Sequence, residues 1–232
     1  AMGPVYPQGC RGSAKIDRRP RSLVLPPVQQ TYDTILLDLG GVLIDVDYHA
    51  SARAFRDLGH PEFERLYSKA QQDHLFDGFE TGALTPGQLL HDGLTDAVID
   101  GCWNAMLGSI PKERIDLVHR LKERYQVLLL SNTNAIHVPA FSAIVERENG
   151  IADFKGVFHG AYYSCEIGLR KPDAEAYQHV LAQHGADPRR TLFIDDSIQH
   201  VIGAREAGLH AAHLDLAKEE VLGLATRSHL PG

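Results

Sequence analysis

The sequence predicts an α/β fold in which a doubly wound, Rossmann-like parallel sheet carries an inserted helical cap. Three observations lead to this prediction. Short aliphatic strands alternate with amphipathic helices, the strands are apolar along their whole length, and three of them end in a polar side chain. Such alternation is typical of βαβ units, and apolar strands are typical of a parallel sheet that helices cover on both faces.

The first elements of the core follow from their hydrophobic patterns. The aliphatic run at 34–37 predicts a short buried strand. A helix is expected at 111–125, because its apolar side chains recur at helical spacing and its charged side chains lie opposite. Four consecutive aliphatic residues predict a second strand at 127–130. A second helix is expected at 134–148, where Gly150 closes it.

The later elements continue the alternation. A short third strand is expected at 157–159. A helix capped by Asp173 is expected to stop at Gly185. The core is completed by a strand at 191–194, a helix whose apolar face holds Ile198, Val201, Ile202 and Ala207, and a weak last strand at 210–214.

Residues 47–110 differ from this pattern, because they contain short helical segments and no convincing strand. Those helices are expected at 50–58, 61–72, 86–94 and 96–106. We therefore expect a helical cap at 47–110, inserted into a Rossmann-like catalytic core made of 31–46 and 111–232; such a cap can close over a site as a lid. Residues 1–30 are rich in Pro, Arg, Gly and Gln without periodicity, so we expect a flexible or disordered tail.

Composition limits the classes of partner. The 232 residues have the composition of an ordinary soluble globule, with a net charge of −7. An acidic protein is not expected to bind nucleic acid or an anionic membrane. No apolar run approaches the roughly 18 residues that span a bilayer, and no signal peptide is evident. The three cysteines form no disulfide or metal-ligand pattern, which favours a reducing cytoplasm. The sequence carries no signal for an oligomeric state.

Polar side chains end three of the expected strands. Asp38 follows the first strand, Ser131 the second, and Asp195 and Asp196 the strand at 191–194. In such sheets ligands bind at the carboxyl ends of strands. Asp38 is a candidate nucleophile for phosphorus or a metal ligand, and the two roles are compatible. The acidic pair suits Mg²⁺. Asp196 is expected to be the direct ligand, and Asp195 is expected to act through a water molecule or by supporting the direct ligands.

Two further features fit a small phosphorylated substrate. Lys171, which lies in a loop beside a proline, would neutralise charge between the nucleophile and the phosphate. Ser131 and the amide of Asn132 would hold a phosphate oxygen at a strand-to-helix turn. A nucleophile, a hydroxyl, a cation and an acidic pair together predict a phosphoryl-transfer site in which Asp38, Ser131 and Lys171 are catalytic.

These motifs resemble, in type, order and spacing over roughly residues 33–215, the haloacid dehalogenase-like hydrolase superfamily. The stretches 39–45, 131–134 and 170–172 look most similar to its bacterial sugar-phosphatase branch, which includes α-D-glucose-1-phosphate phosphatases. The resemblance implies a helical cap of the family's first type. It also implies a phosphatase for sugar phosphates that works through an aspartyl-phosphate, with Mg²⁺ held by Asp38, the carbonyl of Gly40 and Asp196.

Gly40 departs from the family pattern, because most phosphatases of the family have an aspartate there that protonates the leaving group and then activates water. General acid–base catalysis contributes roughly 10²–10⁴-fold in rate. Three consequences follow as alternatives. The leaving group is one that needs little help, or Asp45, His137 or a group of the lid replaces the acid, or the protein binds phosphoesters without rapid turnover.

Three other functions fit the sequence less well than a phosphatase. A haloacid dehalogenase also uses an aspartate nucleophile and needs no second acid, but its chemistry needs no metal, whereas Asp195 and Asp196 favour phosphate. A receiver domain is far smaller and places its acidic pair near the first strand. A sugar-phosphate-binding regulator is supported by Gly40 alone. We therefore predict a cytoplasmic Mg²⁺-dependent phosphatase for small phosphorylated metabolites, with hexose phosphates first.

Overall fold

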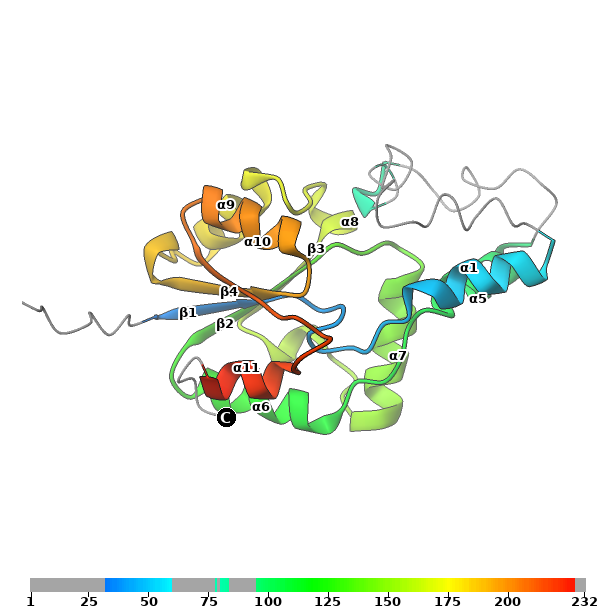
Figure 1. The fold of residues 1–232 in the computed structure, drawn as a ribbon, viewed down its shortest axis with the longest axis horizontal. Coiled ribbons are helices and arrows are strands. Elements are labelled where there is room, and N and C mark those ends of the chain that lie inside the picture. The colour runs from blue at the N-terminus through cyan, green and yellow to red at the C-terminus, as the bar shows by residue number, and fades with distance from the viewer. Residues whose placement is uncertain (1–31, 60–77, 79, 84–94, 228–232) are drawn as a thin grey trace, which may run out of the picture. The chain divides into compact units, whose positions relative to one another are not determined.

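A computed structural model describes residues 32–59, 78, 80–83 and 95–227 of the chain. The described residues contain a five-stranded parallel sheet with the strand order β3-β2-β1-β4-β5 (Figure 1). The strands are β1 Thr34–Leu37, β2 Gln126–Ser131, β3 Gly160–Tyr163, β4 Thr191–Asp195 and β5 His210–His213. This sheet confirms the doubly wound α/β class. The predicted tail at 1–30 and the predicted helices at 61–72 and 86–94 lie outside the described residues.

The register of the central strands brings their carboxyl ends together. β1 lies between β2 and β4, and Leu37 pairs with Leu129 on one side and with Ile194 on the other. Because all three strands run in parallel and end within a residue or two of this row, the residues that follow them meet at one edge of the sheet. Asp38, Ser131 and Asp195 are therefore brought to the same edge.

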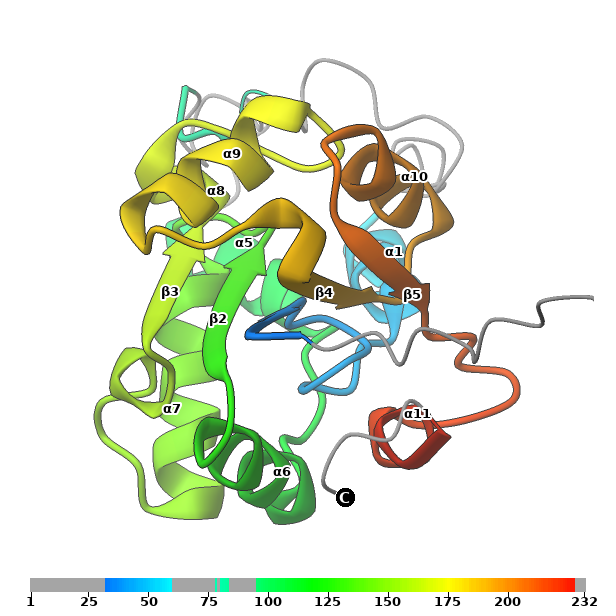
Figure 2. The same ribbon diagram turned by 90° about the vertical axis from the view of Figure 1, so that its left-hand side faces the viewer.

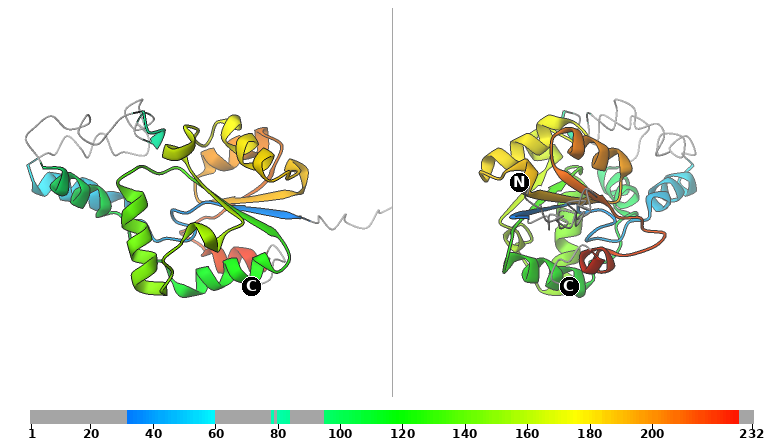
Figure 3. Two further views of the ribbon diagram at one scale, coloured as in Figure 1. Left: turned by 180° about the vertical axis from the view of Figure 1, so that it is seen from behind. Right: turned by 60° about the vertical axis from the view of Figure 1, so that its left-hand side comes forward.

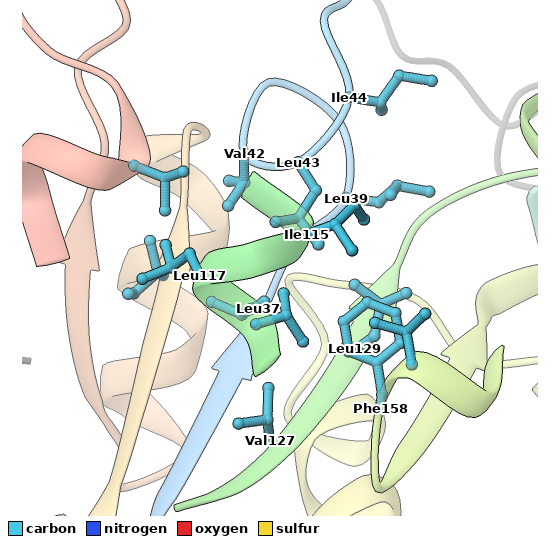
Figure 4. Packing of buried hydrophobic residues seen from close by; sticks show 14 of the residues in the cluster. Leu37, Leu39, Val42, Leu43, Ile44, Ile115, Leu117, Val127, Leu129 and Phe158 are labelled. Carbon is cyan, nitrogen blue, oxygen red and sulfur yellow. The ribbon is translucent and has the colours of Figure 1, made fainter. Parts of the chain in front are cut away.

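Helices cover both faces of the sheet, as the continuous apolar strands predict (Figure 2). The helices α6 Lys112–Lys122, α7 His137–Asn149 and α11 Val221–Arg227 pack on the face that holds Leu37 and Leu129. Figure 4 shows Ile115 and Leu117 of α6 near Leu37, in the same buried cluster as Leu129. The helices α9 Ala174–Gln183 and α10 Ile198–Glu206 cover the opposite face. Among the described residues, no helix has the length and apolar character needed to cross a bilayer.

Two local predictions are wrong. The third strand was expected at 157–159, but β3 begins at Gly160, and Lys155–Val157 form a short 3-10 helix. Val157 and Phe158 are buried in the core through that turn, and their apolar character therefore reflects burial and not strand pairing. Pairing with β2 begins only at His159, whose backbone N–H donates to the carbonyl of Val127 at 2.8 Å.

The predicted apolar face of α10 is wrong for Ile198 and Ile202, although Val201 and Ala207 do pack on the core. Ile198 and Ile202 are 50% and 48% exposed, whereas Val201, Gly203 and Ala204 are buried. Gly203 explains the difference, because a β-carbon there would lie 2.3 Å from the carbonyl oxygen of Pro172. The helix therefore packs through its smallest residues directly against the loop that carries Lys171.

The segment 47–110 provides two described helices, α1 Tyr48–Asp57 and α5 Asp96–Asn104, which lie side by side in Figure 3. Phe55 of α1 meets Trp103 of α5 edge to face, with ring centroids 6.0 Å apart. The hydroxyl of Ser51 donates a hydrogen bond to the carbonyl of Trp103 at 2.8 Å. Trp103 also packs on His137 at the start of α7, with centroids 6.1 Å apart. These contacts attach the inserted helices to the core.

Candidate active site

Three carboxylates gather at the carboxyl edge of the sheet. Asp38 follows β1, Asp195 ends β4, and Asp196 comes directly after it. Each offers one oxygen to a group in which all three oxygens lie within 4.8 Å of one another. Asp38 and Asp195 are buried, and Asp196 is partly exposed. Such a group repels itself unless positive charge lies among it.

Lys171 supplies part of that positive charge. Its ammonium group donates to Oδ1 of Asp38 at 2.6 Å and to Oδ2 of Asp195 at 2.7 Å, and it also lies over the ring of Phe193. Lys171 is wholly buried. Burial alone would lower the pKa of Lys171, but the carboxylates of Asp195 and Asp38 outweigh it and hold that pKa above its ordinary value. The lysine therefore stays charged and ties β1 to β4.

Asp195 has several hydrogen-bond donors besides Lys171. Its oxygens accept from the backbone N–H of Ser197 at 2.7 Å and lie 3.0 and 3.1 Å from Nδ1 of His200. Burial raises the pKa of Asp195, but Lys171 and His200 outweigh burial and lower it below the usual range. Burial and the charge of Asp195 instead raise the pKa of Asp38. One ammonium group thus cannot balance the three carboxylates when all of them are ionised.

Ser131 and Asn132 end β2 beside this cluster, and they differ in their surroundings. Ser131 is buried and pairs with Tyr163 across the sheet. The side chain of Asn132 forms a reciprocal pair with the backbone of Lys171: its Nδ2 donates to the Lys171 carbonyl at 2.8 Å, and its Oδ1 accepts from the Lys171 N–H at 2.9 Å. Asn132 therefore positions the lysine loop, a role that no signal in the sequence indicates. The Lys171–Pro172 peptide bond is cis.

The two glycines after β1 differ in why they carry no side chain. Gly41 has φ +73°, and a β-carbon on it would lie 2.8 Å from Oδ2 of Asp196. Gly40 has no positive φ, and a β-carbon on it would make only ordinary contacts, at 3.5 Å from Cγ2 of Val46 and 3.7 Å from the hydroxyl of Tyr48. The positive φ of Gly41 and the carboxylate next to it both favour glycine at position 41, whereas position 40 has room for a larger residue.

The inserted segment brings two side chains to the site that sequence reasoning missed. Tyr48 is the first residue of α1, and the negative charges of Asp196, Asp38 and Asp195 act on its hydroxyl. Burial, followed by these charges, raises the pKa of Tyr48, so the hydroxyl keeps its proton. A tyrosine at a helix start gives no sequence signal for such a role.

Glu80 is the second of these side chains. Its Oε2 lies 2.7 Å from Nη2 of Arg170, the residue next to Lys171, and both side chains of the pair are largely buried. Burial raises the pKa of Glu80 to about 7, although the charge of Lys171 acts to lower it. Gly82 lies directly on the core, because a β-carbon there would stand 2.7 Å from the carbonyl oxygen of Cys165. This part of the insertion is therefore packed onto the loops around Lys171.

Asp45 and His137, the two named candidates for the missing acid, are held by other partners. Asp45 pairs with Arg114 at 2.8 Å and accepts from the hydroxyl of Ser109 at 3.1 Å. Nδ1 of His137 lies 3.0 Å from Oδ1 of Asn104, and burial lowers the pKa of His137 to about 4. Both residues therefore take part in contacts that join residues 47–110 and the adjoining segments to the core.

Comparison with known proteins agrees with this geometry. The sequence pattern of the haloacid dehalogenase-like hydrolases matches residues 32–208. The D-ribitol-5-phosphate phosphatase of Bacteroides thetaiotaomicron is 27% identical over 186 residues, which cover 75% of this chain and 87% of the relative. The sesquiterpene phosphatase astK of Aspergillus oryzae is 29% identical over 194 residues, covering 79% and 90% respectively.

A solved structure shares both the fold and about a third of the sequence. It is a HAD family enzyme from Bacteroides thetaiotaomicron in complex with magnesium and inorganic phosphate. The likeness has a TM-score of 0.68 at 32% identity and covers 81% of this chain and 96% of the other.

Proposed function

The chain belongs to the haloacid dehalogenase-like hydrolase family, and we propose that it is a Mg²⁺-dependent phosphatase of small phosphorylated metabolites, sugar and alditol phosphates foremost. The observation that carries this proposal is Lys171, wholly buried and held by Asp38 and Asp195 beside Asp196. A phosphate monoester brings two negative charges to the site. Such a site needs fixed positive charge and an oxygen nucleophile, and this cluster provides the nucleophile and part of the charge.

The donor set fits a divalent cation with a preference for oxygen. Three carboxylates carry three negative charges against the single charge of Lys171, which leaves two to be balanced when all are ionised. Carboxylate oxygens are the ligands that Mg²⁺ takes, and it usually binds through one or two of them. Asp38, Asp196 and the carbonyl of Gly40 would hold the ion. Asp195, whose oxygens accept from Lys171 and Ser197, would not bind the ion directly but would stabilise the site around it. When bound, Mg²⁺ supplies charge that draws the phosphate to the nucleophile.

The chain's own residues then divide the reaction into two steps. An oxygen of Asp38 attacks phosphorus, the bond from phosphorus to the ester oxygen breaks, and an aspartyl-phosphate forms on Asp38. Water next attacks the same phosphorus, and inorganic phosphate leaves while the carboxylate of Asp38 is restored. Lys171 offsets the charge that gathers between carboxylate and phosphate in both steps, and Ser131 holds a phosphate oxygen at the end of β2.

The substrate class rests on the relatives and on the insertion. One relative bears the name D-ribitol-5-phosphate phosphatase, and an alditol phosphate is a small polar monoester. We propose that residues 47–110 act as a cap that closes over such a substrate, because this segment places Tyr48 beside Gly40 and pairs Glu80 with Arg170, the residue next to Lys171. A reducing cytoplasm as the location is supported by the free thiols of Cys102 and Cys165.

The test measures phosphate release from a panel of alditol and hexose phosphates, with Mg²⁺ and with a chelator. We expect turnover that needs Mg²⁺ and that Asp38→Asn abolishes. Asp116→Asn is the matched control, because Asp116 lies on α6 in an exposed pair with Lys112. Wild-type protein that binds these esters with Mg²⁺ but releases no phosphate would establish the alternative that Gly40 favours, a sugar-phosphate-binding regulator.

A further inference from the structure

Position 40 lacks a side chain, and the hydroxyl of Tyr48 lies in the space beside it. A β-carbon built on Gly40 would stand 3.7 Å from that hydroxyl and 3.5 Å from Cγ2 of Val46. Both distances are ordinary van der Waals contacts, and the backbone of Gly40 has no positive φ. Neither strain nor crowding therefore requires glycine here. A polar side chain from position 48 reaches the place where a short side chain from position 40 would lie.

The fold holds Tyr48 in this place from several sides. It opens α1 directly after the cap residue Asp47, whose carboxylate accepts from the N–H of His49 at 3.0 Å and pairs with Arg53 at 2.5 Å. Asp47 is also tied to the chain that follows α5, because its N–H donates to the carbonyl of Met106 at 2.9 Å. These contacts of Asp47 fix the start of α1, where Tyr48 lies.

The Tyr48 hydroxyl is subject to the charges of the acidic cluster as well as to burial. Asp38, Asp195 and Asp196 all act on it electrostatically, and Glu80 of the insertion does so too. The hydroxyl lies next to the β-carbon position of Gly40, which is two residues along the chain from the proposed nucleophile Asp38.

We propose that Tyr48 is the proton donor for the leaving group, in the role that a carboxyl side chain at position 40 would otherwise fill. This inference rests on the proposed function and adds one catalytic residue to it. As Asp38 attacks phosphorus and the ester P–O bond breaks, the hydroxyl gives its proton to the departing oxygen, which leaves as an alcohol. In the second step the phenolate takes a proton from the water that attacks phosphorus. The hydroxyl and the carboxylate are both restored.

The role can be tested by varying the leaving group. An alkoxide needs a proton when it departs, whereas the p-nitrophenolate ion is stable without one. In Tyr48→Phe we expect kcat/KM for D-ribitol 5-phosphate or a hexose phosphate to fall about 10²–10⁴-fold, the usual range for loss of a general acid. We expect kcat/KM for p-nitrophenyl phosphate to fall far less. The substitution keeps the ring and so keeps its packing, which thermal unfolding of both proteins checks.

A second variant tests the shared location. In the double variant Gly40→Asp, Tyr48→Phe, a carboxyl group extends into the space that the hydroxyl has left, and we expect it to recover part of the lost activity toward alkyl phosphates. A double variant as slow on alkyl phosphates as Tyr48→Phe alone would count against the inference. Equal losses on both substrates in Tyr48→Phe, or no loss on either, would overturn it.

The failure of this inference is distinguishable from failure of the proposed function. A wild-type protein that hydrolyses neither substrate with Mg²⁺ refutes the phosphatase and this inference together. A wild-type protein whose turnover depends on Asp38, and whose Tyr48→Phe variant keeps the same ratio of kcat/KM between alkyl and p-nitrophenyl phosphate, refutes the role of Tyr48 alone.

Discussion

The carboxylate of Asp196 lies directly against the α-carbon of Gly41. A β-carbon on Gly41 would stand 2.8 Å from Oδ2 of that carboxylate and 2.9 Å from Cδ1 of Leu216, and the glycine has φ +73°. Carbon and oxygen do not approach so closely without bonding, so a larger residue at 41 must displace the carboxylate. A larger residue at position 41 would therefore have to move the side chains of Asp196 and Leu216, besides adopting a positive φ.

Gly41→Ala should weaken magnesium binding through this contact. We expect the Mg²⁺ concentration at half-maximal turnover to rise about 10–100-fold, the range found when groups that orient metal ligands are altered. Gly150→Ala is the matched control, because Gly150 also has a positive φ (+72°) but has no atom within 4 Å of its added β-carbon. It carries the same backbone strain and should leave the Mg²⁺ dependence unchanged. An equal Mg²⁺ requirement in both variants would contradict the assignment of Asp196.

Removing the charge of Lys171 should destabilise the fold. In Lys171→Met the buried carboxylates of Asp38 and Asp195 lose their shared cation, and loss of one partner from a buried pair costs about 3–5 kcal/mol. We expect urea unfolding in chelator to show this loss, and added Mg²⁺ to recover part of it. Lys155→Met removes an exposed ion pair with Glu166 and should cost at most about 1 kcal/mol. A Lys171→Met variant as stable as wild type in chelator would show that the cluster is not ionised as described.

His137 should make the fold sensitive to acid. Burial lowers its pKa from 6.5 to about 4, so between these values the unfolded chain binds a proton that the folded chain does not. Stability is therefore unaffected by this group above pH 6.5 and falls as the pH drops toward 4, by up to about 3 kcal/mol. His137→Gln keeps a donor for Asn104 and should lose less stability over this range.

Urea unfolding at several pH values compares the two proteins. His119→Gln serves as the control, because His119 is exposed on α6, and its pH profile should follow that of wild type. If His137→Gln and wild type lose stability in parallel between pH 6.5 and about 4, another group is responsible.

The packing of Gly82 on Cys165 should matter for turnover. Gly82→Ala places a β-carbon 2.7 Å from the carbonyl oxygen of Cys165 and so pushes the segment that carries Glu80 away from Arg170. We expect kcat/KM for phosphate esters to fall about tenfold or more, because small displacements in a closed site carry large rate penalties. Gly59→Ala is the control, because Gly59 has a positive φ (+91°), as Gly82 does, but no atom lies within 4 Å of its added β-carbon. This variant should retain wild-type kcat/KM. Equal kinetics of the two variants would mean that this contact does not shape the site.

The amino-acid sequence alone predicted the sheet and the residues at its carboxyl edge. Asp38, Ser131 and Asp195 could be named in advance because each directly follows or ends an aliphatic strand, and parallel strands in register place such residues together. Lys171 was predicted from its loop context and its resemblance to a family motif. Predictions for elements at the margin of the sheet were less successful, since Val157 and Phe158 are apolar because they are buried in a turn.

Only the tertiary structure decided what the inserted segment and the connecting loops contribute. Tyr48, Glu80 and the pairing of Asn132 with the Lys171 backbone depend on contacts between residues far apart in the chain. Hydrophobic periodicity predicts which face of a helix is buried. It does not predict which polar side chain of the insertion contacts which polar group of the core. The sequence therefore determined which polar residues lie at the carboxyl edge of the sheet, and the packing of the insertion onto the core decided which further side chains lie near it.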